Sequence, residues 1–389
     1  AVQRLHPKKN SRGFERSSSA PKIPQIMKTI VWAIFLNLCF CERSKSFQES
    51  PDTSRAESQG ILPIPIAFYT PETGLAGGAG LLYFFRPEES SARIRPSTTA
   101  LFLIYTEKKQ FIAQISGEWY FQGGFWRLDG DFLFMRYPQK FFGIGNNTSE
   151  SMEENYTSRI SRMEFKALRS LSPGLNVGLT GLFENRELLD ISPGGQLSGG
   201  TILGRTGGTT VGIGPLMTFD TRDNVFAAEQ GNYHLLSVVA FSGSLGSDYP
   251  YTKTVVNLRQ YLPLGEGQVL AMQMYGSFLS GSPLFHKLAE LGGQETMRGY
   301  FEGRFRDHHY LTTQVEYRTP LFWRIGFVAF AGLGEVAHEI RQFDLPGIKP
   351  SYGFGFRYFF NIQERLNLRV DFGFGNNSSG LYIGPAEAF

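Results

Sequence analysis

The chain has 389 residues, of which 14% are aromatic, and it contains 35 phenylalanines and 17 tyrosines. Its 45 glycines are about 12% of the residues, against about 7% in an average protein, which favours twisted strands joined by tight turns. Residues 1–46 hold nine basic and two acidic residues, so the remainder carries 29 basic and 33 acidic ones. The basic balance therefore belongs to the first segment, and the remainder offers no basic surface for nucleic acid.

Residues 27–46 are predicted to be an export signal, preceded by an upstream segment that completes residues 1–46. Lys28 precedes an apolar run at residues 30–41, which is too short to span a bilayer and is followed by polar residues. Ser46 is a small residue at cleavage spacing, so we expect the mature chain to begin near Phe47.

Both cysteines, Cys39 and Cys41, lie in this predicted signal. Removal of the signal would leave a mature chain without thiols, and therefore without disulfides or a cysteine nucleophile. The alternative is a lipid anchor on Cys39, although the small residue that usually precedes such a cysteine is missing. Residues 47–60 are polar and are predicted to be a short periplasmic linker.

Residues 61–389 are predicted to form an all-β domain, a sixteen-stranded antiparallel transmembrane β-barrel. This part of the sequence has no run of about 18 apolar residues, so a membrane protein would have to be a closed barrel. Sixteen segments follow one another at roughly 20 residues per strand and connection. They cover residues 62–70, 75–86, 97–107, 109–120, 124–136, 155–169, 174–186, 206–219, 231–246, 251–263, 267–280, 308–320, 323–337, 348–360, 364–376 and 380–389.

Alternation is strictest near the end of the chain. In residues 366–374 every second residue is apolar, while the positions between them include Arg369 and Asp371. Residues 352–360 repeat the pattern, with glycines and Arg357 opposite the aromatic residues. Such segments are typical of a barrel with a lipid-facing exterior and a polar interior. A soluble secreted β-protein would alternate too, but it would not explain sixteen matched segments together with an export signal.

The predicted connections fall into two classes. Those after odd-numbered strands include the long ones, at residues 137–154, 187–205, 281–307 and 338–347, whereas most others are tight and residues 220–230 are the exception. Long outer loops and short periplasmic turns are the arrangement of an outer-membrane barrel. We therefore expect the protein in the outer membrane of a Gram-negative-type bacterium, in contact with lipid and lipopolysaccharide.

Four stretches of the predicted barrel are distinctive. They are YPQKFFGIGNNT at residues 137–148, FDTRDNVFAAEQGNY at 219–233, GGQETMRGY at 292–300 and QVEYRTPL at 314–321. In this order, and with an aromatic C-terminal residue, the chain resembles the BamA/TamA superfamily of outer-membrane assembly and translocation barrels, the bacterial surface antigen family, over about residues 60–389. The residues matched to the second stretch of the family are Asp220, Arg222, Asp223, Asn224 and Gly231.

The resemblance implies a loop that folds inward after the eleventh strand and carries an arginine paired with acids on inward faces of the next strands. It places Arg298, Gly299 and Tyr300 in this loop and Glu316 on the polar face of the next strand. A fork-shaped, permanently charged donor suits a carboxylate in a polar lumen; the alternative is a solvated loop arginine. Where the family has a second acid, this sequence has Gly332, which predicts a weaker latch.

Two further departures from the family concern the second stretch and the linker. Ala228 stands where proline is common. Family members that assemble or translocate proteins carry periplasmic modules of roughly 70 to 80 residues before the barrel, and the predicted linker is too short for one. We therefore expect a separate periplasmic subunit as a partner.

The first and last predicted strands are rich in proline. Pro63 and Pro65 lie in the first strand, Pro385 lies in the last, and the chain ends at Phe389. Proline has no N–H and is normally restricted to edge strands, strand starts and bulges. We predict a poorly paired seam here, and in the family this junction is the proposed lateral gate. The alternative is simple fraying at the chain ends.

No catalytic, cofactor or metal site is predicted, and we do not expect an enzyme. Residues 199–206 approach a phosphate-loop spacing, but Arg205 occupies the place of the lysine. Asp307, His308 and His309 are adjacent, yet neighbouring strand residues point to opposite faces, so this pair of imidazoles should not share a metal. The sequence shows no Ser/His/Asp constellation at a believable spacing.

Two functional hypotheses follow. The first is a barrel that assists insertion or translocation of a client protein or lipid. The alternative is a gated pore or surface-antigen scaffold without an assembly role.

Overall fold

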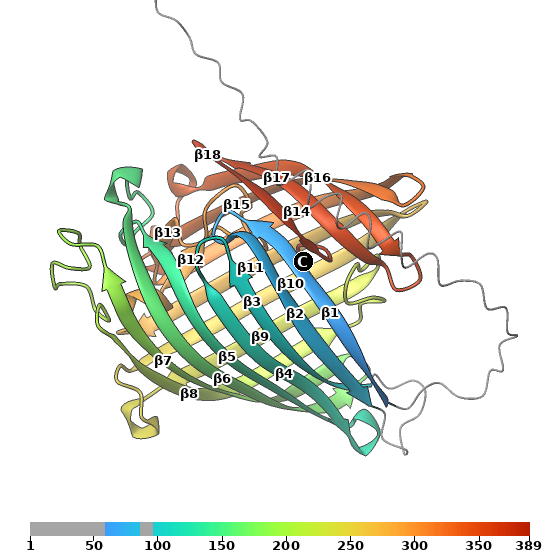
Figure 1. Ribbon diagram of the computed structural model, residues 1–389, viewed down its shortest axis with the longest axis horizontal. Coiled ribbons are helices and arrows are strands. Elements are labelled where there is room, and N and C mark those ends of the chain that lie inside the picture. The colour runs from blue at the N-terminus through green and yellow to red at the C-terminus, as the bar shows by residue number, and fades with distance from the viewer. Residues whose placement is uncertain (1–58, 86–95) are drawn as a thin grey trace, which may run out of the picture. The chain divides into compact units, whose positions relative to one another are not determined.

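The computed structural model describes residues 59–85 and 96–389, which form a closed barrel of sixteen antiparallel strands (Figure 1). The predicted signal and nearly all of the linker lie outside the described residues. The barrel strands are β1 (Gln59–Thr70), β2 (Gly74–Phe85), β3 (Ser97–Thr106), β4 (Phe111–Phe121), β5 (Trp126–Phe141), β6 (Glu154–Ser172), β7 (Leu175–Ile191), β8 (Gly207–Asp220), β9 (Gly231–Phe241), β10 (Tyr251–Gly265), β11 (Gln268–Gly281), β14 (His309–Phe322), β15 (Ile325–Ala337), β16 (Lys349–Asn361), β17 (Leu366–Gly375) and β18 (Ser378–Pro385). All sixteen predicted segments are strands of this barrel.

The remaining elements of the described residues are short. Two three-residue strands, β12 (Ala289–Leu291) and β13 (Phe305–Asp307), pair with each other inside the connection between β11 and β14. Six single turns of 3-10 helix also occur. They are η1 (Gln122–Gly124), η2 (Glu150–Met152), η3 (Gly243–Leu245), η4 (Phe285–Lys287), η5 (Ile340–Gln342) and η6 (Leu345–Gly347). No helix in the described part of the chain is long and apolar enough to cross a bilayer.

Some strand ends differ from the predicted ones for a physical reason. β5 and β7 extend further towards the long loops than predicted, to Phe141 and Ile191, and charged pairs lie at their outer ends in place of alternating apolar residues. Lys140 of β5, for example, binds Glu153 beside the start of β6 at 2.7 Å. β6 instead gains three residues at its turn towards β7. β9 stops at Phe241 instead of continuing to residue 246, because the chain turns into η3.

The two faces of the barrel wall differ as predicted. On β17, Arg369 and Asp371 are buried on the inner side, whereas Phe372 is exposed on the outer side. On β16, Arg357 is buried and Tyr352 is 57% exposed. An exterior that carries many exposed aromatic and aliphatic side chains is stable in lipid rather than in water.

The wall is continuous except where β1 and β18 close it. β1 pairs with β2 along its whole length, and β18 pairs with β17 from Ser378 to Pro385. Between β1 and β18, the described residues contain one pair in register, Tyr69 with Ile383. The first and last strands thus meet over a much shorter stretch than any other pair of neighbouring strands.

Candidate functional site

The connection between β11 and β14, residues 282–308, packs inside the barrel. Its apolar side chains Leu291, Met297, Tyr300 and Phe305 are all buried, and they form one hydrophobic cluster with inward side chains of the wall. β12 and β13 provide a hydrogen-bonded base for this loop. The loop therefore has its own small core, which holds its arginine in the lumen. We call residues 282–308 the lumen loop.

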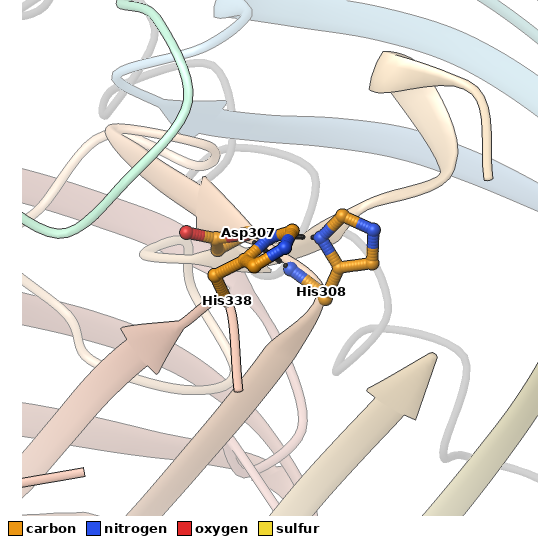
Figure 2. A group of neighbouring side chains, drawn as sticks. All are labelled: Asp307, His308 and His338. Carbon is orange, nitrogen blue, oxygen red and sulfur yellow. Dashed lines mark hydrogen bonds and ion pairs between the residues drawn. The ribbon is translucent and has the colours of Figure 1, made fainter. Parts of the chain in front are cut away.

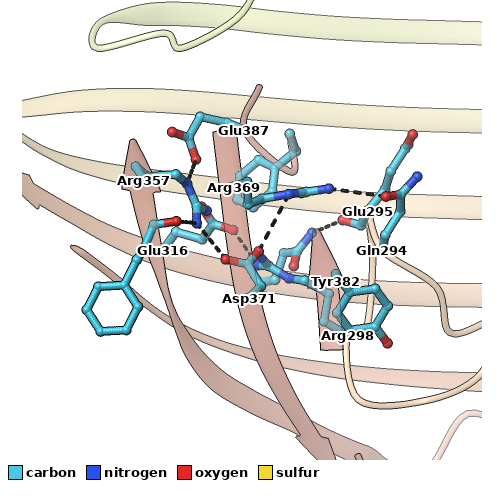
Figure 3. Close-up of polar contacts among 12 residues, drawn as sticks. Gln294, Glu295, Arg298, Glu316, Arg357, Arg369, Asp371, Tyr382 and Glu387 are labelled. Carbon is cyan, nitrogen blue, oxygen red and sulfur yellow. Dashed lines mark hydrogen bonds and ion pairs between the residues drawn. The ribbon is translucent and has the colours of Figure 1, made fainter. Parts of the chain in front are cut away.

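Arg298 is fully buried and joins three strands of the wall (Figure 3). Its Nη1 donates to Asp371 Oδ2 of β17 at 2.6 Å, and its Nη2 donates to Glu316 of β14. Its Cζ also lies 3.6 Å from the ring centroid of Phe330 of β15. A guanidinium can use its fork and its flat face in this way, whereas the ammonium group of lysine cannot.

Arg298 does have a second acid, and it comes from a different strand than the sequence analysis considered. Asp371 lies two strands beyond Gly332, whose lack of a carboxyl group motivated the expectation of a weaker latch. Gly332 pairs with Gln314, and Gln314 instead donates to the backbone oxygen of Glu295 in the lumen loop at 2.6 Å. The loop thus reaches further across the lumen than the sequence indicated.

Arg298 belongs to a larger buried network of ion pairs. Arg318 Nε donates to Glu316 at 3.1 Å, and Arg357 donates through Nη1 to Asp371 and through Nε to Glu387, the latter at 2.6 Å. Arg369 Nη2 donates to Gln294 of the lumen loop at 3.2 Å (Figure 3). The network has four arginines and three carboxylates, namely Arg298, Arg318, Arg357 and Arg369 with Glu316, Asp371 and Glu387.

The charges of this network compensate one another. Transfer of a charge out of water costs several kcal/mol, and the charge is tolerated when partners and hydrogen bonds compensate it. Removing one arginine therefore leaves buried carboxylates that are less well compensated. We therefore expect the loop position to be sensitive to single substitutions at these arginines.

Gly299 sits where a side chain cannot fit. Its φ is 107°, and an added Cβ would lie 2.5 Å from the backbone carbon of Phe374 on β17. The close approach allows two hydrogen bonds to β18: the Gly299 N–H donates to Tyr382 Oη at 2.9 Å, and Ser378 Oγ donates to the Gly299 oxygen at 2.7 Å. The backbone after the arginine is therefore fastened to the last strand.

Tyr300 adds contacts on the β18 side of the seam, and Glu302 fastens the lumen loop on the β1 side. Tyr300 Oη donates to the Pro350 oxygen at 2.9 Å and accepts from the Asn376 N–H at 2.8 Å. Two residues later, the Glu302 N–H donates to Glu72 Oε1 at 2.8 Å, and Glu72 lies in the turn between β1 and β2. Residues 299–302 thus bridge the two ends of the barrel wall from inside.

The structure places the predicted prolines in the two strands that meet at the seam. Pro63 and Pro65 lie within β1 and pair with β2, and Pro385 is the last residue of β18. None of the three has an N–H that could extend the ladder between β1 and β18. The short register at Tyr69 and Ile383 is consistent with this loss.

Phe389 is not a seam residue, which corrects the prediction. The strand ends at Pro385, and Ala386 adopts a φ of 60° that turns the chain inward. The Phe389 ring is buried beside Val269 of β11, and its carbonyl oxygen accepts from Arg318 Nη2 at 3.0 Å. The C-terminal aromatic residue therefore packs against the buried ion-pair network.

The second family stretch folds into a compact loop between β8 and β9. Arg222 donates twice to Asp220, each time at 2.9 Å, and its Cζ lies 4.6 Å from the ring centroid of Tyr233. Gly231 has a φ of 99°, and an added Cβ would lie 2.2 Å from the Thr221 oxygen. These residues shape the loop and are separate from Arg298.

The same loop is tied to the turn between β16 and β17. Asp223 accepts from the Glu229 and Gln230 N–H groups and pairs with Arg365 at 2.5 Å, while Asn224 Nδ2 donates to the Glu364 oxygen at 3.1 Å. Burial disfavours the charge on Asp223, but Arg365 and the backbone donors outweigh burial and hold the pKa of this carboxyl below its usual value. β8 and β17 lie far apart around the barrel. The loop between β8 and β9 therefore reaches across the end of the barrel at which the short turns lie.

Sequence reasoning missed most of the network around Arg298. It found Arg298 and Glu316, and it placed Arg357, Arg369 and Asp371 on an inward face without assigning them partners. Alternation of residues gives the face of a strand, but it does not say which strand lies across the lumen. Tyr382 carried no signal, because a tyrosine in a predicted barrel strand is expected on the lipid side.

Comparison with known proteins agrees with this architecture. A model of the Omp85 superfamily domain matches residues 120–380. A comparison with curated proteins found no match. Among solved structures, BamA from Haemophilus ducreyi lacking POTRA domains 1-3 has a TM-score of 0.59 at 12% identity, covering 92% of this chain and 78% of that chain.

CdiB provides two further structural neighbours. The CdiB structures from Acinetobacter baumannii and Escherichia coli each have a TM-score of 0.50, at 10% and 12% identity. They cover 85% and 87% of this chain and 60% and 64% of theirs, which is less than two thirds. At these identities the likeness shows a shared fold. The family model, in contrast, matches more than half of the sequence, and the chain therefore belongs to the Omp85 superfamily.

Proposed function

We propose that this protein is an outer-membrane barrel that assists the insertion or translocation of a client protein or lipid, and that the seam between β1 and β18 opens during this work. The observation that carries the proposal is the single pair in register at the seam, Tyr69 with Ile383. A separate periplasmic subunit would deliver the client, and outer-membrane lipid and lipopolysaccharide would surround the barrel.

The lumen loop supports this proposal because it holds the seam without being part of the sheet. Gly299 is bonded to Tyr382 on β18, and Glu302 is bonded to Glu72 beside β1. Opening the seam therefore breaks few ladder hydrogen bonds. It also requires the lumen loop to lose its contacts with either β18 or Glu72. A client that enters the lumen and displaces residues 299–302 would thereby release the seam between β1 and β18.

A disulfide across the seam tests the proposal. Tyr69 and Ile383 alternate with the buried residues Thr70 and Tyr382, so both face outward and lie opposite each other. Tyr69→Cys combined with Ile383→Cys should form a bridge that keeps the seam shut. In cells depleted of the wild-type protein, we expect this variant to fail to restore outer-membrane composition until a reductant is added.

The matched control is a bridge in a continuous part of the wall. Phe132→Cys with Met163→Cys joins an outward-facing pair of β5 and β6, and it should restore function with or without reductant. Each single-cysteine variant should also restore function. Full function of the oxidised seam variant would contradict the proposal.

The alternative, a gated pore or surface-antigen scaffold, is favoured by one observation. A cavity of about 250 Å³, whose lining includes the charged residues Glu118, Asp129, Asp131, Glu164 and Lys166, lies along the β3 to β6 side of the wall. A pore would conduct in planar bilayers whether or not the seam is locked. Two results together would favour the pore. The oxidised seam variant would conduct stably, and cells depleted of the protein would keep the outer-membrane composition of undepleted cells.

A further inference from the structure

Two imidazoles and a carboxylate meet where the lumen loop joins β14 (Figure 2). Asp307 ends β13, His308 follows it, and His338 comes directly after β15. β14 and β15 pair with His309 opposite Ala337, so the same register, continued by one residue, sets His308 opposite His338. The sequence analysis considered His308 with His309, whose rings lie 6.5 Å apart, and therefore missed the partner on the next strand.

The spacing of the ligand atoms suits one tetrahedral metal ion. Asp307 Oδ1 lies 3.2 Å from His308 Nδ1 and 3.4 Å from His338 Nδ1, and one ligand atom from each of the three residues lies within 4.8 Å of the others. Two ligands bound to zinc at about 2.0–2.1 Å in a tetrahedron are about 3.3 Å apart. Both distances to Asp307 therefore match this spacing, and the centroids of the two imidazole rings lie 4.4 Å apart.

The carboxylate is unusually crowded if no cation is bound. Asp307 Oδ1 already accepts from the His308 N–H at 2.8 Å, and both imidazole Nδ1 atoms approach the same oxygen. If both nitrogens carried protons, one oxygen would have to accept three hydrogen bonds. Unprotonated nitrogens at these positions would instead direct two lone pairs and a carboxylate towards a shared cation.

The surroundings favour a cation and leave a route to it. A cavity of about 250 Å³ adjoins the cluster, and Asp307, Glu335 and Asp344 line it, while none of its described lining residues is a lysine or arginine. His338 is largely exposed, whereas Asp307 is buried. A fourth coordination position is thus open to water from the rim of the barrel.

We propose that Asp307, His308 and His338 bind one divalent transition-metal ion of the zinc class. Two imidazole nitrogens and one oxygen are typical ligands of zinc, cobalt, nickel or copper, whereas calcium and magnesium prefer oxygen ligands throughout. The bound ion would fasten the end of the lumen loop to the end of β15. The loop that carries Arg298 would then be held at this end by metal as well as by the β12–β13 pairing.

The test is a titration of untagged protein in detergent with zinc chloride, followed by calorimetry, and with cobalt chloride, followed by absorption. We expect saturable binding of one ion. His338→Ala and His308→Ala should each weaken the affinity at least about ten-fold, because loss of a ligand exceeds the loss of an outer-shell partner. His309→Ala is the matched control and should bind as the wild type does.

A second measurement distinguishes variants that have lost a metal ligand from variants that bind poorly because they are misfolded. Zinc should slow proteolytic cleavage of the lumen loop in the wild type and in His309→Ala, and it should have no effect in His338→Ala. The gel mobility of unheated samples shows whether each variant is a folded barrel. Absence of saturable binding by the folded wild type would overturn the proposal, as would equal affinity in folded wild type and His338→Ala.

Discussion

The seam and the β5–β6 part of the wall are held by different forces. β5 and β6 pair without interruption from Trp126 opposite Arg169 to Phe141 opposite Glu154, so backbone hydrogen bonds carry this part of the wall. At the seam one pair is in register, and the neighbouring strands are bridged instead by the lumen loop. A part held by side chains can be released by one competing ligand, whereas a long ladder must break bond by bond.

The charges of the two regions differ in the same way. On the β5–β6 wall the ion pair of Arg162 with Asp131 is 3.5 Å long and partly exposed, so water screens it. Arg298 and its two acids are fully buried, and their mutual attraction is correspondingly strong. Substitutions at matched positions of the two regions should therefore have unequal effects.

The largest effect is expected from Arg298→Ala. It would leave Glu316 and Asp371 with one buried partner fewer, at a cost of about 3 kcal/mol, the lower end for a broken buried pair because Arg318 and Arg357 remain. Arg298→Lys should recover part of this loss, since lysine keeps the charge but not the fork. Samples are heated to a series of temperatures before electrophoresis. The measurement is the temperature at which half of the folded barrel has converted to the unfolded form on the gel.

The control for this comparison lies in the β5–β6 wall. Arg162→Ala should change that temperature little, because exposed ion pairs contribute about 0–1 kcal/mol. Equal unfolding temperatures for Arg298→Ala and wild type, with equal resistance of the lumen loop to protease, would show that Arg298 does not hold the loop.

A smaller effect is expected from Gly299→Ala. The new methyl group would press against the backbone of Phe374 and would force a positive φ on alanine, at a cost of about 1–3 kcal/mol. The loop should move away from β18, so protease should cleave it faster. Gly181→Ala in β7 is the control, because a Cβ added there meets no atom within 4 Å. Similar cleavage of both variants would count against the close packing of residue 299.

The smallest effect concerns the pH dependence of the loop between β8 and β9. The pKa of Asp223 is lowered in the folded state, so its contribution is present above the ordinary aspartate pKa and is lost as the pH falls through the lower folded value. Asp223→Asn should make protease cleavage of this loop nearly independent of pH below about 4. An unchanged acid-induced rise in cleavage would show that another group controls the loop.

Sequence reasoning predicted the sixteen strands because alternation is a local property. Residues 366–374 alone indicate which side chains face lipid and which face the lumen, since successive residues of a strand point to opposite faces. The predicted strand ends were less accurate in β5 and β7, where charged side chains at the outer ends interrupt the apolar alternation. Arg298 and Glu316 were found through the resemblance to a family rather than through any local pattern.

What the sequence by itself determined is therefore the class of fold and the inward faces of the strands. The tertiary structure alone decided that Asp371 is the second acid of Arg298, that Phe389 turns inward, and that His338 lies beside Asp307 and His308. The physical reason is closure of the barrel, which sets strands far apart in sequence opposite one another across the lumen. Which side chains meet there depends on the register of all the strands between them.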